Sequence, residues 1–146
     1  MNITIRDAKT SDKSIITRLI KELAAIEGDP SAIEDDYVGQ YLSNPNVGIL
    51  LAESDNHVIG LLSYAIRPNL YHAGIACLID ELIVSKKMRG KQAGTALIEE
   101  LLQRLHTMKC KEISVAVMPH NLEAKDFYGK HGFNSEIALL ERHFTD

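Results

Sequence analysis

The chain lacks the features on which several common classes of protein depend. It contains two cysteines, Cys77 and Cys110, without CxxC spacing, and its six histidines form no HExxH or other close ligand set. We therefore expect neither a disulfide nor a metal site. No apolar run approaches the ~18 residues of a membrane span, and the first six residues lack a signal-peptide layout. We expect a cytoplasmic protein with no membrane partner.

Basic residues are missing from a long stretch of the sequence. Between Glu22 and Ile66 there is no Lys or Arg, and the charged residues of this stretch are all acidic. The net charge is −4 and the pI is about 5.8, which is unfavourable for binding a phosphate backbone, so no nucleic-acid partner is predicted. The acidic stretch is either a solvated surface or part of a site for a cationic molecule.

The order of apolar patterns predicts a mixed α/β (α+β) fold in one domain, residues 1–146. The 45% hydrophobic and 25% charged composition is typical of a globular domain with its own core. Strands that form a meander precede strands that alternate with helices, so we expect a mostly antiparallel central sheet flanked by helices. Strands are predicted at 3–6, 47–53, 58–66, 78–84, 112–117 and over most of 133–144, and helices at 13–27, 32–42, 96–105 and 121–131.

The central segment joins a buried strand, a polar loop and an amphipathic helix: LIDELIV, SKKMRGKQAGT and ALIEELLQRL. A helix start leaves backbone N–H groups without partners and carries partial positive charge, so it suits a phosphate or pyrophosphate. Lys86, Lys87, Arg89 and Lys91 lie in the same loop. The alternative is an ordinary strand-to-helix turn whose lysines face water.

The loop lacks the GK[ST] ending of a P-loop and the three glycines of a Rossmann fingerprint. It resembles the acyl-CoA loop of the GNAT superfamily of N-acetyltransferases, Arg/Gln-x-x-Gly-x-Gly/Ala, which here reads RGKQAG over residues 89–94, after Val84. Gln92 stands where the family usually has its first glycine. A positive φ at Gln92 would be costly, whereas an ordinary helical or bridge conformation would accept the side chain.

A second motif, NLEAKDFYGKHGF over residues 121–133, resembles the second GNAT signature. Asn121 is suited to cap a helix, and Gly132 is suited to the left-handed residue that ends it. On its own the motif would be read as a helix packed by aromatic residues. With the first motif at the right separation and order, the chain is identified as a member of the GNAT superfamily.

The resemblance implies acetyl-CoA as co-substrate and assigns residues to it. Family members bind the pantetheine arm beside the central strand and the pyrophosphate at the loop, and they keep an Asn near the pantetheine or adenosine part and a Tyr near the sulfur. These roles would fall on Leu82, Ile83 and Val84, then on Arg89, Gly90, Lys91, Gln92, Ala93, Gly94 and Thr95, and on Asn121 and Tyr128. The resemblance also leaves a homodimer open.

The expected chemistry is acetylation of a primary amine of a small molecule. An alkyl ammonium titrates near 10.4 and attacks only after losing its proton, so a carboxylate should assist. Asp80 and Glu81 interrupt an apolar strand, where a charge without a purpose would be expensive. Their side chains would point to opposite faces of a regular strand, so at most one should face the acceptor unless a bulge intervenes. The other could pair with a basic residue. Tyr128 could protonate the departing thiolate.

Other functions stay open from the sequence. A non-catalytic acyl-CoA-binding sensor would need neither Tyr128 nor a carboxylate before Val84, and an acetyltransferase could instead act on a protein N-terminus or lysine. By resemblance to the family, the acceptor pocket lies between the 28–36 connection and the 67–74 loop. The acidic first connection favours a polyamine-like or aminoglycoside-like cation. Length and layout, including ELIV over residues 81–84, are also similar to small aminoalkylphosphonate N-acetyltransferases, whose acceptor is anionic at one end.

Overall fold

The computed structural model describes residues 2–90 and 92–145. One five-stranded sheet in the order β1-β2-β3-β4-β5 forms its centre, antiparallel throughout except for the parallel pair β4 and β5. This confirms the predicted mixed fold with a mostly antiparallel sheet. The strands are β1 Thr4–Asp7, β2 Val47–Ser54, β3 His57–Asn69, β4 Gly74–Val84 and β5 Glu112–Val115.

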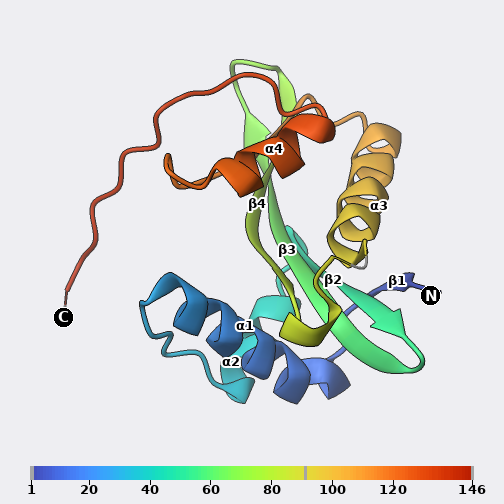
Figure 1. Cartoon of the computed structure of the whole chain (residues 1–146). Helices are drawn as coiled ribbons and strands as arrows, with labels where there is room; N and C mark the ends of the chain where they lie inside the picture. The colour runs from blue at the N-terminus through green and yellow to red at the C-terminus, as the bar shows by residue number, and fades with distance from the viewer. Residues whose placement is uncertain (1, 91, 146) are drawn as a thin grey trace.

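Helices cover both faces of the sheet, as Figure 1 shows, with α1 and α2 on one side and α3 and α4 on the other. The helices are α1 Lys13–Glu27, α2 Asp35–Leu42, α3 Ala93–Thr107 and α4 Leu122–Lys130, with short 3₁₀ turns η1 Thr10–Asp12 and η2 Lys86–Met88. Each face has its own apolar core because side chains alternate along the strands. Ile83 packs towards α1 and α2, whereas its neighbours Leu82 and Val84 pack towards α3 and α4.

The β2–β3 hairpin and the end of α1 follow their turn residues. Asp55 and Asn56 have φ values of 52° and 63°, the paired left-handed conformation of a tight hairpin. Gly28 ends α1 with φ 75°, and its N–H donates to Ala25 O (3.3 Å). Both connections are therefore as the sequence predicted.

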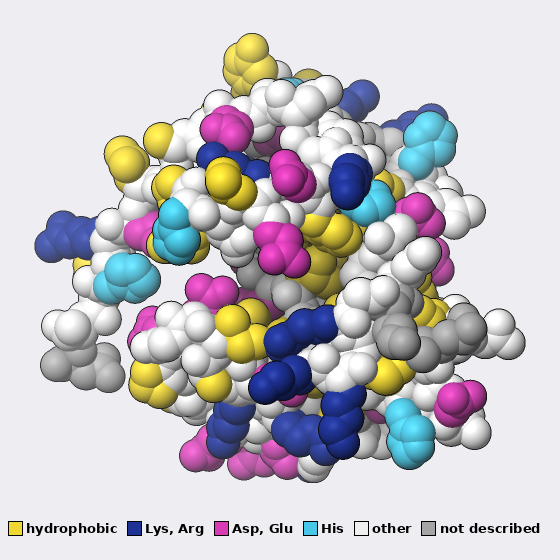
Figure 2. All heavy atoms as spheres, in the orientation of Figure 1, with side chains coloured by type: hydrophobic (Ala, Val, Ile, Leu, Met, Phe, Trp, Pro, Cys, Tyr) yellow, Lys and Arg dark blue, Asp and Glu magenta, His cyan; other side chains and the backbone are white. Residues whose placement is uncertain are grey.

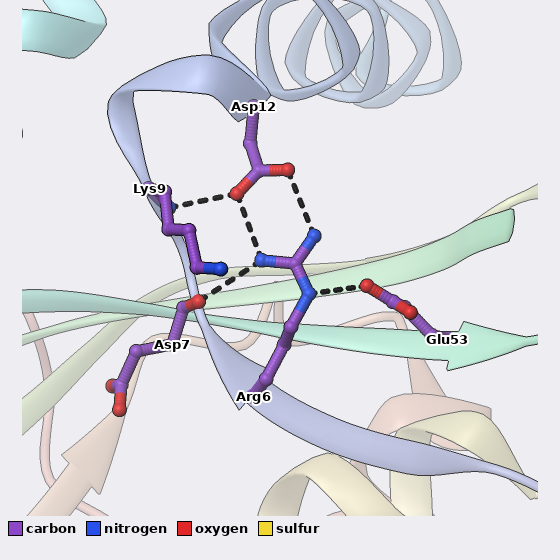
Figure 3. A network of polar contacts seen from close by, with 5 residues as sticks. All are labelled: Arg6, Asp7, Lys9, Asp12 and Glu53. Carbon is purple, nitrogen blue, oxygen red and sulfur yellow. Dashed lines mark hydrogen bonds and ion pairs between the residues drawn. The ribbon is translucent and has the colours of Figure 1, made fainter. Parts of the chain in front are cut away.

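The segment that enters α1 is held by polar contacts and not by a side-chain helix cap. Asp12 does not cap α1 with its side chain. Its two carboxylate oxygens instead accept from Arg6 on β1, at 2.8 Å each, and one of them also accepts from Lys9 N–H at 2.7 Å (Figure 3). Arg6 further pairs with Glu53 on β2. The network joins the first strand, its neighbour and the start of α1, and the Arg6 guanidinium lowers the pKa of Asp12.

The prediction of a strand over most of 133–144 is wrong. This segment contains no strand, and in Figure 1 it runs away from the body of the molecule towards the C-terminus. Its large apolar side chains beyond Phe133 lie in solvent, with Ile137 90% and Leu140 91% exposed. Apolar residues in a segment do not by themselves form a strand, because a strand needs a partner for its backbone groups and a covered face for its apolar side chains.

Candidate active site

The predicted cofactor strand has an open edge. β5 pairs with β4 from Ala76 to Ile79, and beyond that point β4 has no strand partner on this side among the described residues. Ser85 N–H donates to Ile59 O (2.7 Å) and therefore points to β3. Because backbone groups alternate in direction, Ile83 also faces β3, whereas Leu82 and Val84 face the open edge. Leu82 and Val84 are thus placed to hydrogen-bond an extended ligand.

The start of α3 offers unpaired backbone donors. The first hydrogen bond of the helix runs from Ala96 N–H to Gln92 O (3.0 Å). The N–H groups of Ala93, Gly94 and Thr95 precede it and have no acceptor within the helix. Donors in this position, at the positive end of the helix dipole, fit a phosphate group.

Gln92 has the costly backbone conformation. Its φ is 69° and its ψ is 12°, in the left-handed region that glycine occupies without penalty. Gly90, two residues earlier, also has a positive φ of 79°. The loop thus makes the turn usual for a glycine while carrying a glutamine side chain. Lys91, predicted to bind the pyrophosphate, lies outside the described residues.

An acidic residue on α1 holds the basic loop, and the sequence analysis missed it. Glu22 Oε1 accepts from Lys86 N–H (3.1 Å) and from the guanidinium of Arg89 (3.4 Å). Arg89 Nε also donates to Val84 O (3.1 Å). Exposed Lys86, Lys87 and Arg89 follow β4, and Figure 2 shows basic side chains gathered there.

A hollow of about 830 Å³ opens beside this loop. Its lining includes Gly90, Gln92 and Thr95 from the loop and the start of α3, and Asn2, Ile3 and Thr4 at β1.

A bulge in β4 brings both predicted carboxylates to one site. Glu81 pairs with Ser63 and Ile79 pairs with Tyr64, so Asp80 is the extra residue between two successive pairs. In a regular strand Asp80 and Glu81 would face opposite sides. Here both line the same cavity, on the side of α1 and α2. The sequence had left this arrangement open.

Burial perturbs the two carboxylates. The pKa of Asp80 is raised by burial, and the pKa of Glu81 is raised by burial and further by Asp80. A hydrogen bond from Ser63 Oγ to Glu81 Oε1 acts in the opposite direction, and Glu81 N–H donates to the same Oγ (3.0 Å). Within residues 2–90 and 92–145, neither carboxylate forms an ion pair with Lys or Arg. Their charge is therefore available to a ligand.

The cavity that these carboxylates line measures about 550 Å³, a size suited to a small molecule. Of the 28–36 connection, only Ser31, Ala32 and Ile33 line it, and its acidic residues do not. The 67–74 loop does not line it either. His72 in that loop contacts Glu112 of β5 instead (Nε2 to Oε2, 3.1 Å). The 28–36 connection and the 67–74 loop thus contribute less to this cavity than the sequence indicated.

Helix α4 brings the second motif against the first. Asn121 Oδ1 accepts from Ala124 N–H (3.0 Å), so Asn121 caps the helix as predicted. Phe127 lies over Gly94, where an added Cβ would be 3.4 Å from its ring. Tyr128 is buried between Phe127 and Phe133, at centroid distances of 5.1 and 5.3 Å, and burial raises its pKa to about 12. Its hydroxyl therefore stays protonated at neutral pH.

The described residues hold neither a cluster of metal-binding side chains nor a helix able to span a membrane. No cluster of three or more His, Cys, Asp or Glu side chains in 2–90 and 92–145 is arranged to hold a metal ion. Over the same residues, no helix has the length and apolar character needed to cross a membrane. Cys77 and Cys110 are both free thiols.

The sequence model of the Acetyltransferase (GNAT) family matches residues 14–133, which include the open edge, the loop, the carboxylates and α4. The chain belongs to this family. The GNAT chain is 29% identical over 129 residues to an aminoalkylphosphonate N-acetyltransferase of Salmonella typhimurium, an alignment that covers 88% of this chain and 83% of the relative. The resemblance to the family and the assignment as an acetyl-CoA-dependent N-acetyltransferase are thereby confirmed.

Solved structures share the fold of this GNAT chain. An aminoglycoside acetyltransferase from an uncultured soil metagenomic sample superposes with a TM-score of 0.83 at 19% identity, covering 98% of this chain and 95% of that one. A transcriptional regulator from Bacillus halodurans superposes with a TM-score of 0.86 at 20% identity, covering 98% and 100%. At such identities the likeness establishes the architecture alone, so the acceptor must be argued from the cavity.

Proposed function

We propose that this acetyltransferase transfers the acetyl group of acetyl-CoA to the primary amine of a small molecule. The observation that carries the proposal is the position of Asp80 and Glu81. Both carboxylates line a cavity of about 550 Å³, and both belong to β4, one edge of which is open at Leu82 and Val84. An amine in the cavity and a thioester along that edge would meet at the same stretch of β4.

Acetyl-CoA supplies the acetyl thioester, and its proposed binding site consists of backbone and side-chain groups that fit its separate parts. The free N–H groups of Ala93, Gly94 and Thr95 suit its pyrophosphate, and the nearby Arg89 adds positive charge. Leu82 and Val84 at the open edge suit the amide groups of the pantetheine arm. Ile83, which the family resemblance also assigns to this arm, directs its backbone to β3.

The carboxylates are assigned to the incoming amine. An alkyl ammonium must lose a proton before its nitrogen can form the new C–N bond, and Glu81 or Asp80 would accept that proton directly or through water. Partial burial raises the pKa of both groups, which makes them stronger bases than fully solvated carboxylates. Their negative charge also attracts the ammonium form into the cavity before it is deprotonated.

The leaving thiolate and the carbonyl oxygen are assigned to two further groups. As the C–S bond breaks, the sulfur needs a proton, which the Tyr128 hydroxyl would donate. The pKa of Tyr128, raised to about 12, keeps that proton in place at neutral pH. The carbonyl oxygen gains negative charge in the transition state, and the Val84 N–H at the open edge would stabilise it.

Two alternatives make different demands on these residues. A non-catalytic acyl-CoA sensor would require the loop but not the paired carboxylates or Tyr128. An acetyltransferase for a protein N-terminus or lysine would have to admit a chain end to the cavity. The aminoalkylphosphonate N-acetyltransferase relative supports a small acceptor.

The experiment measures thiol release from acetyl-CoA against a panel of primary amines, together with thermal unfolding in the presence of CoA. A CoA-dependent rise in Tm is expected by mass action, and amine-dependent thiol release should follow. A CoA-dependent shift with no turnover on any amine, peptide or protein acceptor would favour the sensor. No shift at millimolar CoA would exclude both.

A further inference from the structure

The cavity beside Asp80 and Glu81 has mainly apolar walls, contributed by four segments distant in sequence. Ile16 and Val38 are 2% and 1% exposed, and Ile49 and Leu61 of the sheet are 6% and 0% exposed. Apolar atoms of these buried side chains form the cavity's inner wall. A ligand that fills the cavity must cover this wall with its own apolar surface, because water or a charged group there would find no partner.

Aromatic rings line the α2 side of the cavity. Tyr37 and Tyr41 lie one turn apart, with ring centroids 6.4 Å apart and planes tilted by 55°. Tyr41 is half-buried and its hydroxyl donates to Tyr64 O (3.5 Å), whereas Tyr37 is 55% exposed. Such rings pack well against another aromatic ring or an alkyl chain, and their faces also attract an ammonium group.

The charge of the cavity has one sign. Asp80 and Glu81 are the ionisable acids that line it, and none of the described residues lining it is Lys, Arg or His. An ammonium group therefore finds a counter-charge at β4. A phosphonate, phosphate or carboxylate on the same ligand would be placed against apolar walls near two carboxylates, at a cost in both desolvation and repulsion.

The same walls disfavour a ligand with several positive charges. The acidic residues of the 28–36 connection do not line the cavity, so a second or third ammonium would lie against Ile16, Ile20 or Ile33 without a counter-charge. This argues against the polyamine-like or aminoglycoside-like acceptor that the acidic stretch favoured. Ser63 and the two carboxylates form a polar part of the lining on the β-sheet side.

We propose that the acceptor is a primary amine carried on an apolar aryl or alkyl body, with no acid group and no second charge. The ammonium would lie at Asp80 and Glu81, and the apolar body would extend between α1 and α2 to the rings of Tyr41 and Tyr37. The role of this ligand as acetyl acceptor rests on the proposed function. Its binding, however, can be measured without turnover.

The test compares equilibrium binding of 2-phenylethylamine, 2-aminoethylphosphonate and spermidine to the full chain by calorimetry, with CoA present. We expect 2-phenylethylamine to bind at least ~10-fold more tightly than either of the others, about 1.4 kcal/mol. Equal or tighter binding of the phosphonate or of spermidine would overturn the proposal, and so would the absence of measurable binding of 2-phenylethylamine.

A variant at the mouth of the cavity localises the effect. Tyr37→Ala removes an aromatic ring that is 55% exposed, so the fold should tolerate it, and we expect 2-phenylethylamine to bind several-fold more weakly. Tyr71→Ala is the matched control, because Tyr71 is 91% exposed on the β3–β4 connection and does not line the cavity. Equal losses in the two variants would contradict the assigned site.

Turnover separates this inference from the proposed function. Acetylation of 2-aminoethylphosphonate but not of 2-phenylethylamine would leave the enzyme assignment intact and overturn the ligand class. Tight binding of 2-phenylethylamine with no thiol release from bound acetyl-CoA would support the ligand class and remove the proposed function.

Discussion

Ser63 on β3 and Glu81 on β4 are joined by two hydrogen bonds, one from Glu81 N–H to Ser63 Oγ (3.0 Å) and one from Ser63 Oγ to Glu81 Oε1. The pair lies beside the bulge at Asp80, where two successive β4 residues line the cavity. The serine therefore fixes the orientation of Glu81 and also favours its ionised form, against the effect of burial.

Ser63→Ala should shift the acid side of the pH–rate profile to higher pH. The serine hydrogen bond lowers the pKa of Glu81, so its removal raises that pKa, and a base must be ionised to accept a proton. Activity should fall most at low pH and recover as pH rises. The measurement is kcat/KM against pH on the best acceptor. An unchanged profile would mean that Glu81 is not the titrating base, and Asp80→Asn would then be examined in the same way.

Tyr128→Phe should lower kcat about 10²–10⁴-fold while acetyl-CoA affinity changes little, because ring volume is kept and the proton donor is lost. Tyr64→Phe is the control, since Tyr64 also packs against the α3 core but has no proposed role. Because burial raises the pKa of Tyr128 to about 12, wild-type activity should show no loss from its ionisation at ordinary alkaline pH. Full turnover by Tyr128→Phe would show that water or another group supplies the proton.

Gln92→Gly should stabilise the protein. A non-glycine residue in the left-handed region costs about 1–2 kcal/mol, and the entropy that glycine loses on folding offsets about 0.5–1 kcal/mol of the gain. The free energy of unfolding in urea should therefore rise by up to about 1 kcal/mol. Gln92→Ala keeps the φ of 69° and its cost, so it should show no such gain. A destabilised glycine variant would mean that the Gln92 side chain makes a compensating contact.

Asp12→Asn should destabilise the protein at neutral pH by about 1.5–3 kcal/mol, the usual worth of hydrogen bonds to a charged group. Asp12 accepts twice from Arg6, and its pKa is lowered from the model-compound value of 3.8 (Figure 3). A carboxyl group with a lowered pKa stabilises the fold above its unfolded pKa and loses that effect as pH falls through the folded value.

The difference between wild type and Asp12→Asn should therefore shrink below about pH 4, measured by urea unfolding at several pH values. Asp29→Asn is the control because Asp29 is exposed and forms no side-chain hydrogen bond or ion pair with the described residues. A difference that stays constant into acid would mean that the Arg6–Asp12 pair does not carry the effect.

The sequence by itself determined the order of strands and helices up to Gly132, the loop-to-helix donor site and the identity of the two acidic residues in β4. These features depend on residues close together in the chain. The apolar run of β4, the loop from Arg89 to Gly94 and the cap at Asn121 are set by local periodicity, turn residues and capping, which nearby residues decide.

Only the tertiary structure decided which of these residues act together. The register between β3 and β4 creates the bulge that directs the side chains of both Asp80 and Glu81 to one cavity. Glu22 contacts Arg89, which lies 67 residues away in the sequence. The 133–144 segment shows the converse, because its apolar residues, predicted to form a strand, find no partner strand among the described residues. A single-sequence pattern specifies a local conformation, whereas strand register, long-range contacts and burial depend on segments that the pattern does not contain.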